Sequence, residues 1–200
     1  MSLEQSCQLK IGEVMTQIHI VAIGGSTRPD STTELALRIA GIAAERAGAK
    51  VTYVTGTDLI LPMYDLNEPA RHPVAIDFVE SVRQVDGLIL ASPGYHGGMS
   101  GLFKNAMDYL EDLREDDRPY LHGRGVGCIS TAYGWQAAVS TLQQLRQITH
   151  ALRGWPTPMG GAINSLVSKF DSDSGCSDES TTTTLEMIGQ QVVEFAQKHR

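Results

Sequence analysis

Apolar residues along this chain alternate between short continuous runs and stripes with helical spacing. The runs predict strands at residues 18–23, 50–54, 87–91, 126–130 and 155–161. The stripes predict helices that begin near residues 35, 76, 102, 138 and 185. Strands separated by helices favour parallel pairing with right-handed crossovers. We therefore predict an α/β fold, a doubly wound open parallel sheet of five strands with helices on both faces.

Two segments stand apart from this alternation. Residues 1–16 show no clear period, which predicts a loose N-terminal extension to a single domain at 17–200. Residues 164–184 are rich in Ser, Thr, Asp and Gly, which predicts a flexible surface loop.

Charge and cysteine content narrow the function classes. The formal net charge of -7 argues against nucleic acid as a partner, because no basic stripe is present to neutralise phosphates. No apolar run is long enough to cross a membrane, and no secretory signal is visible. The cysteines, Cys7, Cys128 and Cys176, form no CxxC pair. We expect a cytoplasmic protein with no membrane partner and no metal site.

The first candidate site is the loop from Gly24 to Thr33, which runs from a strand into a helix. In open α/β sheets, ligands bind beyond the carboxyl ends of the strands, and helix N-termini favour anions. Hydroxyl groups and one guanidinium could therefore bind a phosphate here; the candidate residues are Ser26, Arg28, Ser31, Thr32 and Thr33. The alternative is a simple helix-capping loop.

The pattern of this loop also limits which phosphate it could bind. The loop lacks the Gly-Lys-Ser/Thr ending of a nucleoside triphosphate site. It also lacks the G-x-G-x-x-G spacing of a dinucleotide fold. No acidic residue stands at the end of the second predicted strand, at Val54. A cofactor with a single terminal phosphate fits best.

Two further loops follow predicted strands at the same edge of the sheet. The second carries Pro93, Gly94, Tyr95, His96 and Gly97, whose backbone could meet the polar edge of a flat ring. The third carries Ser130, Thr131, Ala132 and Gly134, with Tyr133 and Trp135 able to wall a stacked ring. The alternatives are a glycine-rich turn with a solvated His96, and a Trp135 that packs under the following helix.

The chain resembles the NADPH-dependent FMN reductase family, a flavodoxin-like group with quinone, azo and chromate reductases among its members. The family form Gly-Ser-x-Arg-x-x-Ser is met by Gly25, Ser26, Arg28 and Ser31. The form Pro-Glu-Tyr-Asn becomes Pro93-Gly94-Tyr95-His96, followed by Phe103-Lys104-Asn105-Ala106. The run Leu61-Pro62-Met63-Tyr64-Asp65 is also similar to a family segment. Gly94 and His96 depart from the family's acid and amide.

The resemblance implies a flavodoxin-like fold and an enzyme that uses FMN. Electrons would pass from NADPH or NADH through FMN to a small-molecule acceptor such as a flavin or quinone. The resemblance also implies a homodimer or homotetramer. No acid–base pair is needed for this chemistry, so we assign no catalytic side chain. The alternative is a flavodoxin-type electron carrier that binds FMN without being an NAD(P)H oxidoreductase.

Overall fold

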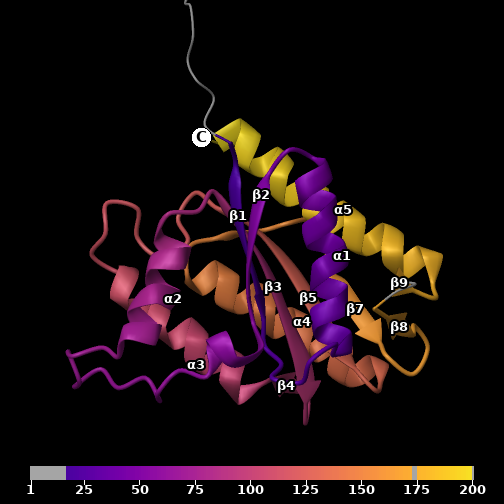
Figure 1. Cartoon of the computed structure of the whole chain (residues 1–200), viewed down its shortest axis with the longest axis horizontal. Coiled ribbons are helices and arrows are strands. Elements are labelled where there is room, and N and C mark those ends of the chain that lie inside the picture. The colour runs from indigo at the N-terminus through magenta and orange to yellow at the C-terminus, as the bar shows by residue number, and fades with distance from the viewer. Residues whose placement is uncertain (1–16, 173–174, 200) are drawn as a thin grey trace, which may run out of the picture.

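A twisted parallel sheet in the order β2-β1-β3-β5-β6 forms the centre of the molecule (Figure 1). The computed structural model describes residues 17–172 and 175–199, so the predicted extension at 1–16 lies outside the described residues. The main strands are β1 (His19–Gly24), β2 (Lys50–Thr55), β3 (Gly87–Tyr95), β5 (Gly125–Ala132), β6 (Trp155–Pro156) and β7 (Gly161–Asn164). Short β7 pairs with β5 in parallel, and β4 (Gly98–Met99) pairs antiparallel with β3. The predicted parallel α/β sheet is confirmed.

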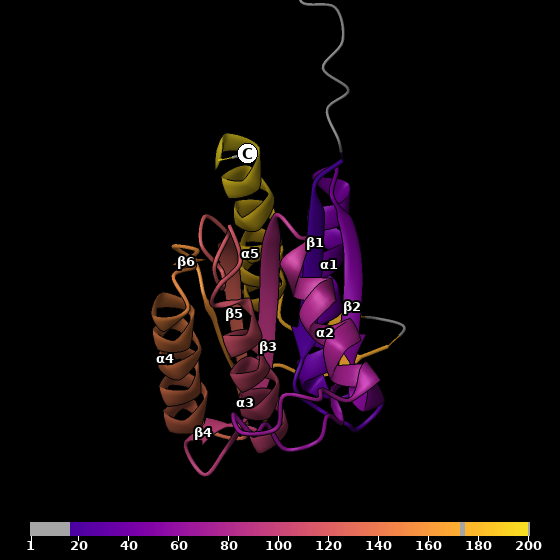
Figure 2. The ribbon, with the colours of Figure 1, turned by 90° about the vertical axis from the view of Figure 1, so that its left-hand side faces the viewer.

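Helices cover both faces of this sheet. They are α1 (Thr32–Arg46), α2 (Pro73–Arg83), α3 (Gly101–Asp108), α4 (Trp135–Ala151) and α5 (Glu179–His199). Two 3-10 turns lie at Gly56–Leu59 and Tyr109–Leu113. One core cluster packs α1 and α5 against the sheet, and the other packs α2, α3 and α4 against the opposite face. Figure 2 shows α2 and α3 in front of the strands and α5 behind them.

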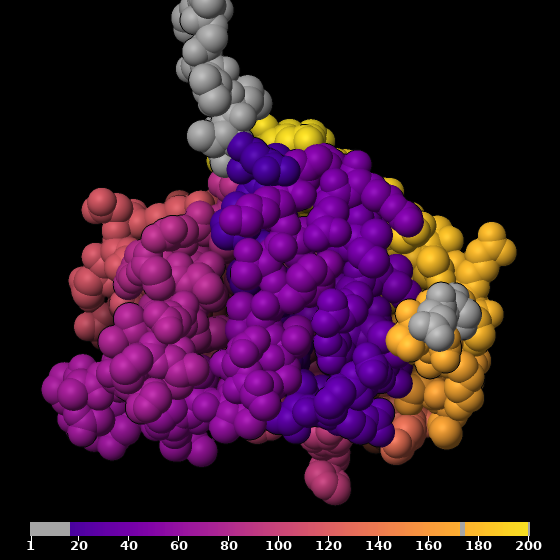
Figure 3. Space-filling view, viewed as in Figure 1, coloured from indigo at the N-terminus to yellow at the C-terminus, as the bar shows by residue number. Residues whose placement is uncertain are grey.

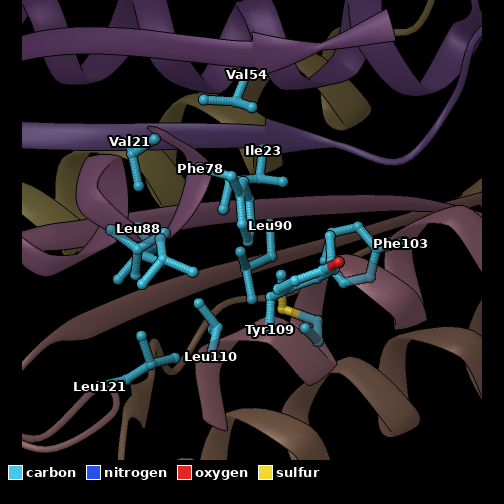
Figure 4. Packing of buried hydrophobic residues seen from close by; sticks show 14 of the residues in the cluster. Val21, Ile23, Val54, Phe78, Leu88, Leu90, Phe103, Tyr109, Leu110 and Leu121 are labelled. Atoms are coloured by element: carbon cyan, nitrogen blue, oxygen red, sulfur yellow. The ribbon is translucent and has the colours of Figure 1, made fainter. Parts of the chain in front are cut away.

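The alternating directions of side chains along each strand explain the two clusters. Val21 and Ile23 of β1 point to the face that also receives Leu88 and Leu90 of β3. Figure 4 shows these side chains meeting Phe78, Phe103 and Leu110 from the helical layer. Strands buried on both faces have the continuous apolar runs that the sequence displays.

Local capping sets where the helices next to the sheet edge begin. The Ser31 Oγ accepts a hydrogen bond from the Glu34 amide at 3.2 Å and starts α1. The Ser100 Oγ accepts from the Phe103 amide at 3.2 Å and starts α3 in the same way. These hydroxyls satisfy amides that have no intrahelical partner. Both helices therefore start at the edge where β1 and β3 end.

Several predicted boundaries differ from the observed ones. β3 extends to Tyr95 and β5 to Ala132, so residues assigned to loops are the last residues of strands. The single strand predicted at 155–161 is replaced by two short strands: β6 ends at Pro156, and β7 begins at Gly161 and extends to Asn164. The predicted loop 164–184 contains a small hairpin, β8 (Phe170–Asp171) with β9 (Gly175–Cys176), and the start of α5. Within the described residues, no helix meets the length and hydropathy needed to cross a membrane.

Candidate functional site

A surface cavity lies at the carboxyl edge of the sheet, where β1, β3, β5 and β7 end. This edge is the lower side of Figure 1, where α1 starts and β4 lies. In Figure 3 the β3–β4 turn projects below the rest of the surface at the same place. The cavity has a volume of about 180 Å³ and is lined by Ser26, Arg28, Ser31, Thr32, Thr33, Pro93, Gly94, Tyr95, Thr131, Ala132, Tyr133 and Ser165. The three loops predicted to form one site are thus brought together.

The first turn of α1 supplies the polar side of the cavity. Thr32 and Thr33 lie in this turn, whose amides have no intrahelical carbonyl partner, and Ser31 caps it. Ser26 is buried, and its Oγ accepts a hydrogen bond from the Arg28 amide at 3.3 Å. Arg28 is the charged side chain among the described residues that line the cavity. Ser31 both caps the helix and lines the cavity, so capping does not exclude Ser31 from ligand binding.

Buried hydrogen bonds fix the first loop to its neighbours. The Thr33 and Thr131 hydroxyls meet at 2.6 Å and join α1 to the end of β5. The Ser100 Oγ donates to the Gly25 carbonyl at 2.8 Å, and the Gly25 amide donates to the Ala91 carbonyl at 2.8 Å. These contacts link the ends of three strands. The polar wall of the cavity therefore has a fixed position relative to the sheet.

The second loop is a tight hairpin. Tyr95 pairs with Gly98, so His96 and Gly97 form a two-residue turn, with φ values of 53° and 85°. Positive φ at both positions is typical of a type I′ turn, which suits the twist of a hairpin. His96 is exposed at this turn and, like Gly97, is not among the cavity-lining residues. The hairpin presents Gly94 and Tyr95 to the cavity instead.

Two residues predicted for the third loop, Ser130 and Gly134, also do not line the cavity. Ser130 is fully buried within β5, and its hydroxyl donates to the Ala138 carbonyl of α4. Gly134 is the N-cap residue of α4. Trp135 is 55% exposed, so it is not buried under the helix. Thr131 and Ala132 do line the cavity.

The structure adds Tyr133 and Ser165 to the lining. The sequence singled out Tyr133 as an aromatic wall, without including it among the cofactor-binding residues. Ser165 lay inside the segment predicted as a flexible loop, although it directly follows β7. Its amide donates to the Ala132 carbonyl at 2.8 Å. The rule that ligands meet the carboxyl ends of strands would have found Ser165 had the last strand been extended past Gly161.

Comparison with known proteins identifies the family. The family model described as NADPH-dependent FMN reductase matches residues 18–165. The chain belongs to this family.

Curated relatives of this family member include azoreductases. An FMN-dependent NADPH-azoreductase of Staphylococcus haemolyticus is 32% identical over 105 residues, which is 52% of this chain and 49% of that protein. An NADPH azoreductase of Bacillus sp. is 30% identical over 86 residues, 42% of this chain and 45% of that protein. The chain thus spans about half the length of these curated relatives.

Solved structures show the fold of this family member. The flavoenzyme NAD(P)H:(acceptor) oxidoreductase FerB of Paracoccus denitrificans superposes with a TM-score of 0.76 at 20% identity, covering 91% of this chain and 98% of that one. A flavodoxin, WrbA-like protein of Agrobacterium tumefaciens gives a TM-score of 0.63 at 16% identity, covering 92% and 100%. The predicted flavodoxin-like fold is confirmed.

The segments at 61–65 and 103–106, both of which resemble family segments, contact each other. The Asn105 Nδ2 donates to the Pro62 carbonyl at 2.9 Å, and its Oδ1 accepts from the Tyr64 amide at 2.8 Å. The Tyr109 hydroxyl also donates to the Pro62 carbonyl, at 3.1 Å. Asn105 therefore holds the loop at 61–65 against α3. Its role is to fix a loop beside the sheet edge, and it does not line the cavity.

Proposed function

We propose that this chain is an FMN-dependent oxidoreductase that passes two electrons from NADPH or NADH to a small acceptor such as a flavin or quinone. The observation that carries the proposal is a single cavity with an anion-binding helix start, hydroxyls and Arg28 on one side and Tyr95 and Tyr133 on the other. Membership in the NADPH-dependent FMN reductase family and the names of the relatives support it.

The donor set of the cavity fits the phosphate of FMN. Ser26, Ser31 and Thr32 offer hydroxyl donors beside the first-turn amides of α1. A phosphate at a helix N-terminus is favoured by the helix dipole and by the free amides. Arg28 adds a guanidinium whose geometry matches two phosphate oxygens. These groups would hold FMN by its phosphate end.

The other side of the cavity fits a flat ring system. Pro93, Gly94 and Tyr95 are the last residues of β3, and all three line the cavity. Tyr133 is 73% exposed and Tyr95 is 59% exposed, so both rings are accessible to a ligand. A volume of about 180 Å³ is below that of an enclosed ligand pocket. We infer that part of the flavin lies along the surface between these tyrosines.

The protein's contribution to the reaction is position and electrostatics. When bound, FMN supplies the hydride-accepting and electron-transferring chemistry. Among the described residues that line the cavity there is no carboxylate or imidazole that could act as a general acid or base. The side chains would fix the cofactor through its phosphate and leave an exposed ring face for donor and acceptor.

The direct test is to identify the cofactor and its electron donor. Mass spectrometry of the ligand released from purified protein, or loaded onto it, should give FMN and not FAD. NADPH or NADH oxidation with a quinone should then proceed without a partner protein, which separates this function from a flavodoxin-type carrier. Tight FMN binding with no oxidation of either nicotinamide would contradict the proposal and favour the carrier.

We further propose a cytoplasmic homodimer or homotetramer. Trp135 and Val139 stand one helical turn apart on α4 and are 55% and 43% exposed. Neighbouring exposed apolar side chains on one helix favour an interface between copies of the chain. Analytical ultracentrifugation should give a mass of two or four chains, and a monomer at micromolar concentration would contradict this part.

A further inference from the structure

One face of α4 lies along the whole β3–β4 hairpin. The residues that make the contact are spaced at three, four and seven positions, so they share one side of the helix; they are Ala137, Ser140, Thr141 and Gln144. The Ser140 Oγ donates to the Gly97 carbonyl at 2.9 Å. The Gln144 Nε2 donates to the same carbonyl at 3.1 Å. The turn of the hairpin is therefore held by two side chains that lie 43 and 47 residues further along the chain.

Gln144 also contacts the second strand of the hairpin. Its Oε1 accepts a hydrogen bond from the Met99 amide at 3.3 Å. The side chain packs so closely that a Cβ added at Gly98 would lie 3.2 Å from the same oxygen. Gln144 thus uses both ends of its amide group on one hairpin, and a residue without a donor and an acceptor could not replace it.

Apart from α4, the hairpin is anchored where it leaves the sheet: the Ser100 amide donates to the Ser92 Oγ at 3.0 Å, and Met99 packs against the core. β4 has two residues, and Tyr95 is 59% exposed. An isolated two-stranded hairpin is marginally stable in water. At the base of the hairpin, a Cβ at Gly94 would lie 2.8 Å from the Thr141 Oγ1 and 3.1 Å from the Ala137 carbonyl. The helix therefore fixes both the base and the turn of the hairpin.

We propose that Ser140 and Gln144 are positioning residues for the flavin, because they fix the hairpin that presents Gly94 and Tyr95 to the cavity. This inference rests on the proposed function. They act only on the ring side of the site, since the phosphate side is built from α1. Their loss should weaken binding of the flavin ring and leave phosphate binding intact.

The test compares Gln144→Met and the double variant Ser140→Ala/Gln144→Met with Gln143→Met, a neighbouring exposed glutamine on the same helix. In the flavin-free protein, hydrogen exchange at amides 95–99 should be faster in the Gln144 variants only. FMN affinity, measured by fluorescence titration, should fall about tenfold in Gln144→Met, as expected for the loss of two neutral hydrogen bonds. The double variant should lose more.

Riboflavin, which lacks the phosphate, separates positioning from general destabilisation. Its affinity should fall by the same factor as that of FMN in the Gln144 variants, whereas Arg28→Ala should weaken FMN and spare riboflavin. Unchanged hydrogen exchange at 95–99, or faster exchange with unchanged flavin affinities, would overturn the inference alone. A wild-type protein that binds neither flavin would overturn the proposed function as well, even if exchange of the hairpin responds.

Discussion

Arg28 is the side chain whose charge matters most to the proposed site. It is exposed at the rim of the cavity, next to the hydroxyls of α1. A charge-assisted hydrogen bond to phosphate contributes about 1.5–3 kcal/mol, so Arg28→Ala should raise the Kd for FMN roughly ten- to a hundredfold. Fluorescence titration measures this directly. Arg46→Ala, at the far end of α1, is the matched control, and an equal effect of both variants would place the phosphate elsewhere.

Close packing around Gly94 explains why this chain has a glycine where the family's motif has an acid. A Cβ at Gly94 would approach Thr141 Oγ1, a buried hydroxyl without a hydrogen-bond partner in the described part of the chain. Gly94→Ala should therefore lower the free energy of unfolding by about 1–3 kcal/mol through overpacking. The cost should be smaller in a Thr141→Ala background, because the closest atom is gone. Additive costs in a urea-denaturation cycle would show that the two residues do not compete for this space.

At the scale of elements, Arg124 joins the end of α2 to the strands that follow. The side chain is 1% exposed and donates to three carbonyls, at 2.9 Å to Val85, 2.6 Å to Tyr120 and 2.7 Å to Arg83. Burial lowers the pKa of Arg124 to about 10, which still leaves it charged at neutral pH.

Replacing Arg124 tests this connection. Arg124→Met would leave buried carbonyls unpaired and should lower the free energy of unfolding by roughly 1–3 kcal/mol. Urea denaturation should show that loss, with Arg46→Met changing stability little. If both variants unfold at the same urea concentration, the carbonyls have other partners and Arg124 does not join these elements.

The first strand carries a pH-dependent contribution. Burial, with Lys50 nearby, lowers the pKa of His19 below its ordinary 6.5, against the opposing effect of Asp86. The Nε2 of His19 lies 2.8 Å from the Thr52 hydroxyl of β2. The unfolded chain then binds a proton more readily than the folded one, so stability falls as the pH drops below about 6.5.

Unfolding free energies measured between pH 7 and pH 5 should fall less steeply in His19→Gln than in the wild type. The exposed His150 of α4 provides the control, and His150→Gln should keep the wild-type slope. Identical slopes for all three proteins would show that His19 is not responsible.

How far the sequence predicts each element depends on the signal that the element carries. Buried strands such as β1 were predicted to within a residue because their apolar runs are continuous. The β3–β4 hairpin was missed because His96-Gly97 is a less typical type I′ pair than Asn-Gly. The sequence did not predict the start of α5 because the residues there are poor helix formers. It is fixed by Asp178, whose carboxylate accepts from the Ser180 amide at 3.1 Å and whose pKa is lowered chiefly by the Thr181 hydroxyl.

On the scale of the whole molecule, the site follows from topology more than from any one motif. Parallel strands place their carboxyl ends at one edge, so segments around Ser26, Tyr95 and Thr131 meet although they are far apart in sequence. This placement was predictable. Which side chains face the cavity was not, because the direction of Ser130 and His96 depends on register and on a turn that only the structure shows.

The proposed function requires that this cavity binds FMN and that a reduced nicotinamide delivers electrons to the bound cofactor. The most direct measurement is an anaerobic titration of the FMN-loaded protein with NADPH and, separately, NADH, followed by the visible absorbance of the flavin. We expect about one equivalent of at least one donor to bleach the bound flavin and an added quinone to restore its colour. A flavin spectrum that persists in excess of both donors would show that neither nicotinamide delivers electrons to the bound FMN.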